Sequence, residues 1–148
     1  MARRYSAWGR DTNTVNITVF GLTSTTAIRP RIYDFIIGSE ATPADQAARM
    51  TLQRTTTTGT STAVTPIALD PSDPAATFTA GENHSGEPTY TASALLLQLA
   101  LNQRATFRWV AAPGGEIVLP ATASNGAALF AAVVTSAYVV TVQTYVEE

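Results

Sequence analysis

The chain is built from short apolar segments separated by clusters of turn-forming residues. In residues 15–20 and again in residues 139–146, one set of alternate positions is mainly Val or Ile. A period of two residues is typical of a strand with one buried face. The spacing of these segments predicts an all-β chain, folded as a single-domain antiparallel β-sandwich or jelly-roll-like barrel. The expected turns and loops fall at residues 58–62, 70–74, 81–88, 113–115 and 124–126.

One segment carries the start signals of a helix. Thr42 is a suitable N-cap, Pro43 fits the first helical position, and Asp45 places an acid in the first turn. About two turns would follow. The sequence therefore predicts one short connecting helix near residues 43–50.

Residues 94–101 read ALLLQLAL, a composition that suits a helix. A strand is favoured because Thr and Tyr precede the segment and an aromatic, β-type segment follows it. As a strand it would place Leu95, Leu97, Leu99 and Leu101 on one face and Ala94, Leu96 and Ala100 on the other. Both faces would then be apolar, so a cover is expected, either from the chain itself or from another subunit.

The length of 148 residues fits one domain. We expect residues 1–12 to form an N-terminal arm or an edge strand, and residues 13–148 to form the sandwich domain. The basic start of the chain is not followed by an apolar run, and no run is long enough to span a membrane. We therefore expect no signal peptide and no membrane partner.

The composition is low in charge and rich in threonine. Charged residues make up 14% of the chain, the formal net charge is −2, all nine basic residues are arginine, and 24 residues are threonine. A weakly charged surface gives little reason to bind nucleic acid but permits self-association. A Thr-rich monomer surface is the alternative interpretation. The lack of cysteine excludes disulfides and thiolate chemistry.

The candidates for chemistry are few. His84, the single histidine, falls in the predicted loop 81–88 without a nucleophile motif nearby, so we interpret it as an exposed loop residue. Asp70 and Asp73 could share calcium, but the ligand series of a calcium loop is missing, and turn capping is favoured. We expect no enzyme, no catalytic, metal or cofactor site, and no cofactor.

The densest basic and aromatic cluster is at the start of the chain, in Arg3, Arg4, Tyr5 and Trp8, with Arg10 nearby. Arg, Tyr and Trp are enriched at protein interfaces, so these residues are the candidate partner interface. Two alternatives stay open. The cluster could stack on nucleic acid, or it could be an edge strand whose aromatic side chains complete the core of the protein itself.

Several stretches in order resemble small all-β virion proteins of tailed bacteriophages, of the head decoration (cement) type. They are RRYSAW, FIIGSEATPADQAARMTLQR, VTPIALDPSDPAA, FRWVAAPGGEIVLP and the terminal TYVEE. The resemblance implies a homotrimer on the capsid surface of the virion that binds the major capsid protein lattice and stabilises the head. The alternatives are a tail, baseplate or fibre-base component and a carbohydrate-binding β-sandwich module with Trp8 or Trp109 in its site.

Overall fold

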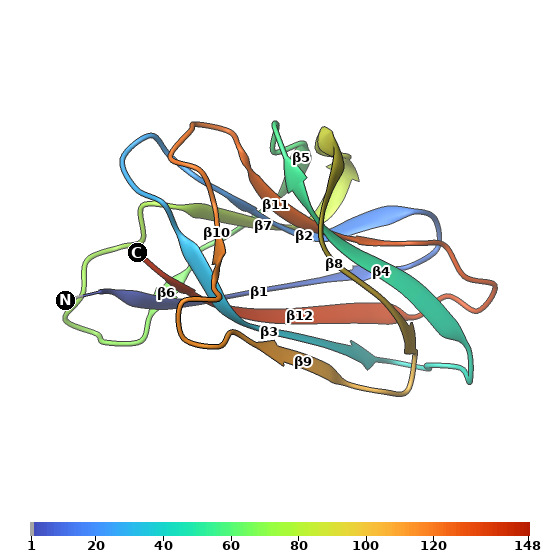
Figure 1. Cartoon of the computed structure of the whole chain (residues 1–148). Helices are drawn as coiled ribbons and strands as arrows, with labels where there is room; N and C mark the ends of the chain where they lie inside the picture. Colours follow the sequence, from blue (N-terminus) through green and yellow to red (C-terminus); the bar gives the residue numbers. More distant parts are fainter. Residues whose placement is uncertain (1) are drawn as a thin grey trace.

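A computed structural model describes residues 2–148, and over this range the chain forms strands and no helix. Two antiparallel sheets lie face to face without closing into a barrel (Figure 1), which confirms the predicted β-sandwich. The strands are β1 (Arg4–Thr12), β2 (Ile17–Thr23), β3 (Arg31–Glu40), β4 (Ala47–Thr55), β5 (Thr60–Val64), β6 (Ile67–Ala68), β7 (Thr79–Gly86), β8 (Tyr90–Asn102), β9 (Phe107–Val110), β10 (Ile117–Val118), β11 (Gly126–Ala131) and β12 (Val139–Glu147).

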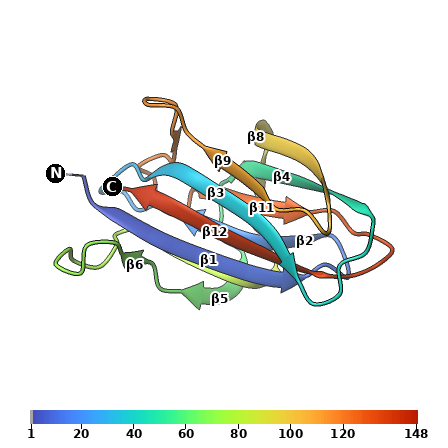
Figure 2. The same cartoon turned by 90° about the horizontal axis from the view of Figure 1, so that it is seen from below.

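The first sheet, sheet A, has the order β10-β3-β12-β1-β6, and β9 also pairs with β3. Figure 2 shows β3, β12 and β1 side by side across it. Strand β12 pairs with β1 on one side, from Arg4↔Glu147 to Thr12↔Val139, and with β3 on the other. The ends of the chain therefore meet, and Arg3 and Glu148 exchange two backbone hydrogen bonds of 2.9 Å.

The second sheet, sheet B, has the order β5-β7-β2-β11-β4-β8. Its two outer strands differ greatly in length, because β5 has five residues and β8 has thirteen. The core between the sheets is formed by strand side chains at alternate positions, which point inward. Strand β12 buries every second residue, and the largest side chains without exposed area include Phe35 of β3 and Leu129 of β11. Burial of this apolar area is the main force that holds the two sheets together.

The helix predicted near residues 43–50 is wrong. Residues 47–55 form β4, a strand in the interior of sheet B between β11 and β8. The Asp45 carboxylate accepts a hydrogen bond from the Asn102 side chain at 2.7 Å instead of capping a helix. The strand buries Ala48, Met50 and Leu52 at alternate positions, and this period of two outweighs the local cap signals.

The loop predicted at residues 81–88 is also wrong for most of its length, because β7 occupies residues 79–86. Its inner position in sheet B covers it on both edges, by β2 and by β5. Strand β2 pairs with residues 79–82, and the His84 side chain packs beside Gly21 of β2. His84 is buried, with 9% of its surface exposed, and is not an exposed loop residue. The polar composition of this stretch favours a loop, but Gly81 and Gly86 let β5 approach closely.

Residues 4–12 are a strand of the sandwich and do not form a separate arm. Strand β1 pairs with β12 along its whole length, whereas β6 pairs with it only at Tyr5 and Ser6. Most of β1 is thus at an edge of sheet A, beside β7 and β2 of the other sheet. The Glu82 carboxylate accepts a hydrogen bond from the backbone N–H of Arg10 at 2.8 Å, so this side of the sandwich is closed.

Candidate protein-binding site

The candidate interface at the start of the chain is divided by the alternation of β1. Tyr5 points into the core with no exposed area, contacts Phe78 edge to face at 5.7 Å, and donates a hydrogen bond to the Pro74 carbonyl at 3.1 Å. Arg3, Arg4 and Trp8 remain at the surface. Tyr5 is therefore a core residue, and a partner has access only to the other three.

Arg4 and Trp8 lie on the outer face of sheet A, where the register places them beside residues of β12. The Arg4 guanidinium lies 5.5 Å from the centre of the Tyr33 ring, and the centre of the Tyr145 ring lies 6.2 Å from the centre of the Tyr33 ring. Trp8 is 41% exposed. We call Arg4, Trp8, Tyr33 and Tyr145 the aromatic face. The two tyrosines were not predicted, because their neighbours are distant in sequence.

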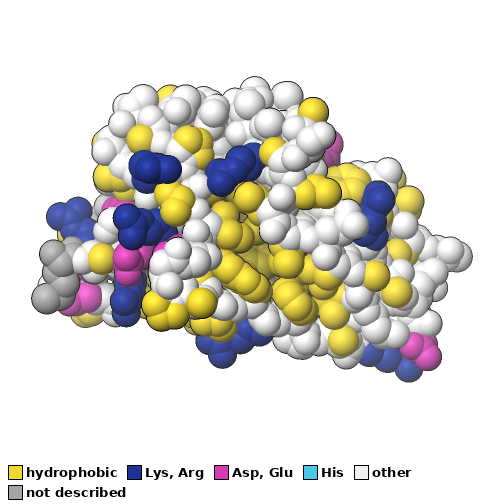
Figure 3. Space-filling model, viewed as in Figure 1, with side chains coloured by type: hydrophobic (Ala, Val, Ile, Leu, Met, Phe, Trp, Pro, Cys, Tyr) yellow, Lys and Arg dark blue, Asp and Glu magenta, His cyan; other side chains and the backbone are white. Residues whose placement is uncertain are grey.

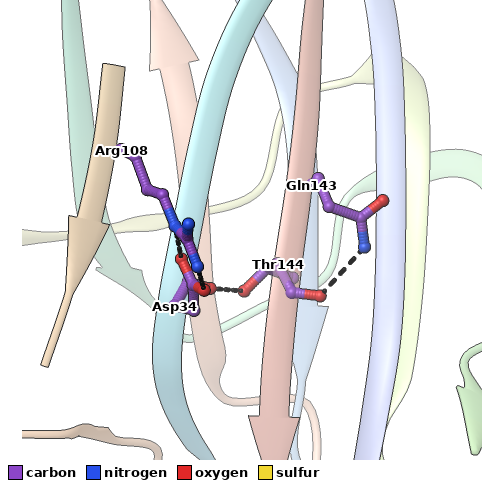
Figure 4. Close-up of polar contacts among 4 residues, drawn as sticks. All are labelled: Asp34, Arg108, Gln143 and Thr144. Atoms are coloured by element: carbon purple, nitrogen blue, oxygen red, sulfur yellow. Dashed lines mark hydrogen bonds and ion pairs between the residues drawn. The ribbon is translucent and has the colours of Figure 1, made fainter. Parts of the chain in front are cut away.

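One ion pair on this sheet fastens β9 to β3 (Figure 4). Arg108 donates two hydrogen bonds to the carboxylate of Asp34, at 3.0 and 2.5 Å, and the pKa of Arg108 is raised by this contact. The buried Thr144 hydroxyl donates to the Asp34 carbonyl at 3.0 Å. A bidentate arginine–carboxylate pair fixes the orientation of the two side chains as well as their distance. The pair therefore holds β9 against β3 at the edge of the sheet.

The opposite side of the sandwich from β1 is open. Strand β8 ends sheet B and pairs only with β4, and β9 pairs only with β3 of sheet A. Within residues 2–148 no strand pairing joins β8 to β9, so both keep a free edge. We call the apolar side chains between these edges the open seam; they pack on the core but are only partly buried, and they are Leu96, Leu97, Leu99, Leu101, Phe107, Trp109 and Ile117.

Figure 3 shows hydrophobic side chains gathered in a hollow on this face of the molecule. Next to the seam, one side-chain hydrogen bond joins the two sheets, and Gln103 joins the loops that follow β3, β8 and β11. Arg54 of β4 donates a hydrogen bond to the Val118 carbonyl of β10 at 3.0 Å. Gln103, which is 1% exposed, accepts one from the backbone N–H of Ala44 and donates another to the Ser136 carbonyl. The seam is therefore an open gap between two sheets that are joined beside it.

The prediction that residues 90–101 form a strand is confirmed, but the predicted faces are only partly right. The register with β4 shifts between Leu97 and Leu95, so Leu96 is an extra residue. Leu97, Leu99 and Leu101 share the inner face with Leu52 and its neighbours, as expected. Leu95 is transferred to the outer face and is 50% exposed, because an inserted residue reverses the alternation. A bulge of this kind leaves no signal in the hydrophobic pattern.

His84 lies in a second concave region, on the outer face of sheet B. The cavity has a volume of about 360 Å³ and is lined mostly by glycine, threonine and serine from β2, β5, β7 and the loop before β5. Burial lowers the pKa of His84, and the nearby Glu87 carboxylate opposes this shift. Glu87 itself accepts hydrogen bonds from the backbone N–H and the hydroxyl of Thr18, and the Thr18 hydroxyl lies 2.5 Å from the Tyr90 hydroxyl. The Glu87 carboxylate is thus bound to Thr18 and positions the loop before β8.

The other polar candidates have local structural roles. The Asp70 carboxylate accepts the backbone N–H of Ser72 at 2.9 Å, which is the turn capping favoured from sequence. Residues 2–148 hold no group of three acidic or histidine side chains arranged to bind a metal. No helix long and apolar enough to cross a membrane occurs in the same range.

Comparison with known proteins identifies no relative of this chain. No family model, no curated protein and no solved structure matches the chain. The function is therefore inferred from the open seam, the free edge of β8 and the aromatic face.

Proposed function

We propose that this chain is a structural subunit that works by binding other protein surfaces. The observation that supports the proposal is the open seam, in which a row of partly buried apolar side chains lies beside the free edge of a long strand. Monomeric proteins rarely leave such an edge uncovered, and large exposed apolar patches mark interaction sites. From the resemblance of the sequence, we propose that the assembly is the head of a tailed bacteriophage and that the chain is a capsid decoration protein.

Such a subunit would stabilise its assembly by burying apolar surface at its contacts. Each square ångström of apolar surface removed from water contributes about 25 cal/mol, and a contact with few charges avoids the large cost of burying unpaired ones. In a decoration protein each copy would bind the major capsid protein lattice as part of a homotrimer. Repetition over a symmetric shell multiplies a modest contact into a large gain in shell stability.

The aromatic face is the proposed contact with the shell. We retain Arg4 and Trp8 of this face, and the exposed Arg3 that precedes β1, as partner contacts, whereas Tyr5 is excluded by its burial. Exposed Trp and Arg side chains on a rigid strand are typical anchors of protein interfaces. The seam and the aromatic face belong to different parts of the surface, so contact with the shell leaves the seam available to a neighbour.

The test uses phage heads that lack the decoration protein. Purified protein is mixed with these heads and sedimented, and the bound copies are counted and located by electron microscopy. We expect saturable binding over the whole head, and we expect Trp8→Ala to weaken it at least tenfold. Thr14→Ala, an exposed substitution away from the aromatic face, is the matched control.

Other outcomes would contradict the proposal. Density at a single vertex would place the chain in the tail or baseplate and reject the decoration role. Binding to a glycan array that Trp8→Ala abolishes would favour the carbohydrate-binding alternative. For that alternative, Trp8 lies on the outer face of sheet A and Trp109 lies partly buried in the open seam, so the two side chains belong to different surfaces.

A further inference from the structure

We propose that β8 pairs with β8 of a second copy of this chain, antiparallel and about a two-fold axis. This inference rests on the proposed function, and it names the partner of the open seam. Its starting point is the free edge of β8, whose outward N–H and C=O groups have no strand beside them among residues 2–148. A second strand would satisfy these groups, which is the common mode of sheet extension between chains.

A long regular edge without charge distinguishes β8 from the other free edges. Residues 97–102 pair with β4 in unbroken register, so the opposite edge of this segment is regular as well. The strands β6, β9 and β10 have two to four residues. Strand β5 has five, but it lies on the closed side, away from the seam. Six residues of β8 offer about 20 Å of edge. Residues 7–12 of β1 form an edge of the same length, but it carries Arg10 and Asp11, and the Arg10 N–H already donates a hydrogen bond to Glu82.

The absence of charge along β8 favours a second copy as the occupant. Sequence positions 88–103 contain no Asp, Glu, Lys or Arg, and positions 89–102 contain no proline. Proteins protect exposed edge strands from one another with such residues. In a two-fold contact, each residue near the axis meets the same residue of its partner, so any charge there would repel itself. A neutral strand is therefore complementary to itself.

The side chains on both faces of β8 fit the same arrangement. On the inner face, Leu97, Leu99 and Leu101 would extend the apolar row into the row of the other copy. On the outer face, Gln98 and Ala100 are exposed and neutral, so they would oppose no charge. Pairing would thus join two sheets B into one continuous sheet and bring the two open seams together.

This contact is compatible with a trimer on a shell. Neighbouring three-fold positions of a closed lattice are related by two-fold axes, so a two-fold contact would connect one trimer to the next. The pairing would then link the decoration proteins to each other, in addition to their contact with the shell.

The experiment uses the two-fold symmetry of the proposed contact, which brings position 98 of one copy close to position 98 of the other. We compare two variants, Gln98→Lys and Gln98→Glu, and measure native mass by sedimentation at matched concentration. We expect each variant alone to have half the mass of the wild-type assembly. Mixing the two variants should restore the full mass. In a pairing centred on Leu99, the lysine introduced in one copy lies diagonally across the axis from the glutamate introduced in the other, within reach of long side chains. Thr62→Lys on β5, the opposite edge of the same sheet, is the control and should keep the full mass.

Circular dichroism and thermal unfolding of each variant establish that it is folded. A wild type that stays at the mass of the charge variants up to its highest soluble concentration overturns the inference. So does a threefold drop in mass, which would assign β8 to a three-fold contact, or a failure of the mixture to regain mass. If such a protein still saturates phage heads, the proposed function survives and only the β8 pairing is rejected.

Discussion

Replacement of Tyr5 by alanine tests whether Tyr5 is a core residue or an interface residue. Tyr5 has no exposed area, contacts Phe78 edge to face and donates its hydroxyl to the Pro74 carbonyl. Removal of a buried aromatic side chain costs about 3–5 kcal/mol, which includes the lost aromatic pair. Tyr5→Phe removes only the hydrogen bond and should cost about 1 kcal/mol. Trp8→Ala, on the exposed face of the same strand, should cost about 1 kcal/mol or less.

Urea unfolding followed by fluorescence or circular dichroism measures these differences. With a slope of about 2 kcal/mol per molar urea, Tyr5→Ala should lower the unfolding midpoint by about 2 M. Trp8→Ala should move it by about 0.5 M or less while it weakens binding to phage heads. If Tyr5→Ala costs no more stability than Trp8→Ala, Tyr5 is not in the core and the placement of β1 within the sandwich is wrong.

Three further predictions concern buried polar groups. Gln103→Ala should destabilise the fold by about 2 kcal/mol in urea unfolding, because the Ala44 N–H and the Ser136 carbonyl lose their partner. His84 has a pKa lowered by burial from 6.5, so its contribution is present above pH 6.5 and is lost as pH falls through the folded-state pKa. The unfolding midpoint should therefore fall between pH 7 and pH 5, roughly, and His84→Gln should flatten that fall. Burial raises the pKa of Tyr90 and of Tyr138 to about 12. The absorbance of their tyrosinate forms should therefore develop about two pH units above that of an exposed tyrosine. The stability that the two side chains provide below pH 10 should be lost as the pH rises toward 12.

The parts of the fold that follow from local pattern could be predicted from the sequence. The strand at residues 139–147 buries alternate residues, and a period of two is visible in a single strand. The strand at residues 17–23 could also be predicted, but it buries residues 17–20 in succession instead of one face. The strand at residues 90–102 could be predicted for a related reason, since its flanking residues favour β structure.

The failures arise where distant pairing decides the outcome. Residues 43–50 carry real helix signals, but β11 and β8 on either side stabilise a strand there. His84 lies in a polar stretch that becomes a strand only because β2 and β5 pair with it. The aromatic face depends on pairing between the two ends of the chain, which no local signal predicts.

Amide hydrogen exchange of β8 tests the central claim, that the open side of this sandwich exists to bind protein. In dilute solution, the amides of residues 97–102 that point away from β4 should exchange quickly, because they have no partner. In the concentrated protein or on phage heads the same amides should be protected, with β5 unchanged. Equal and rapid exchange of those amides in the free and the assembled protein would contradict the account.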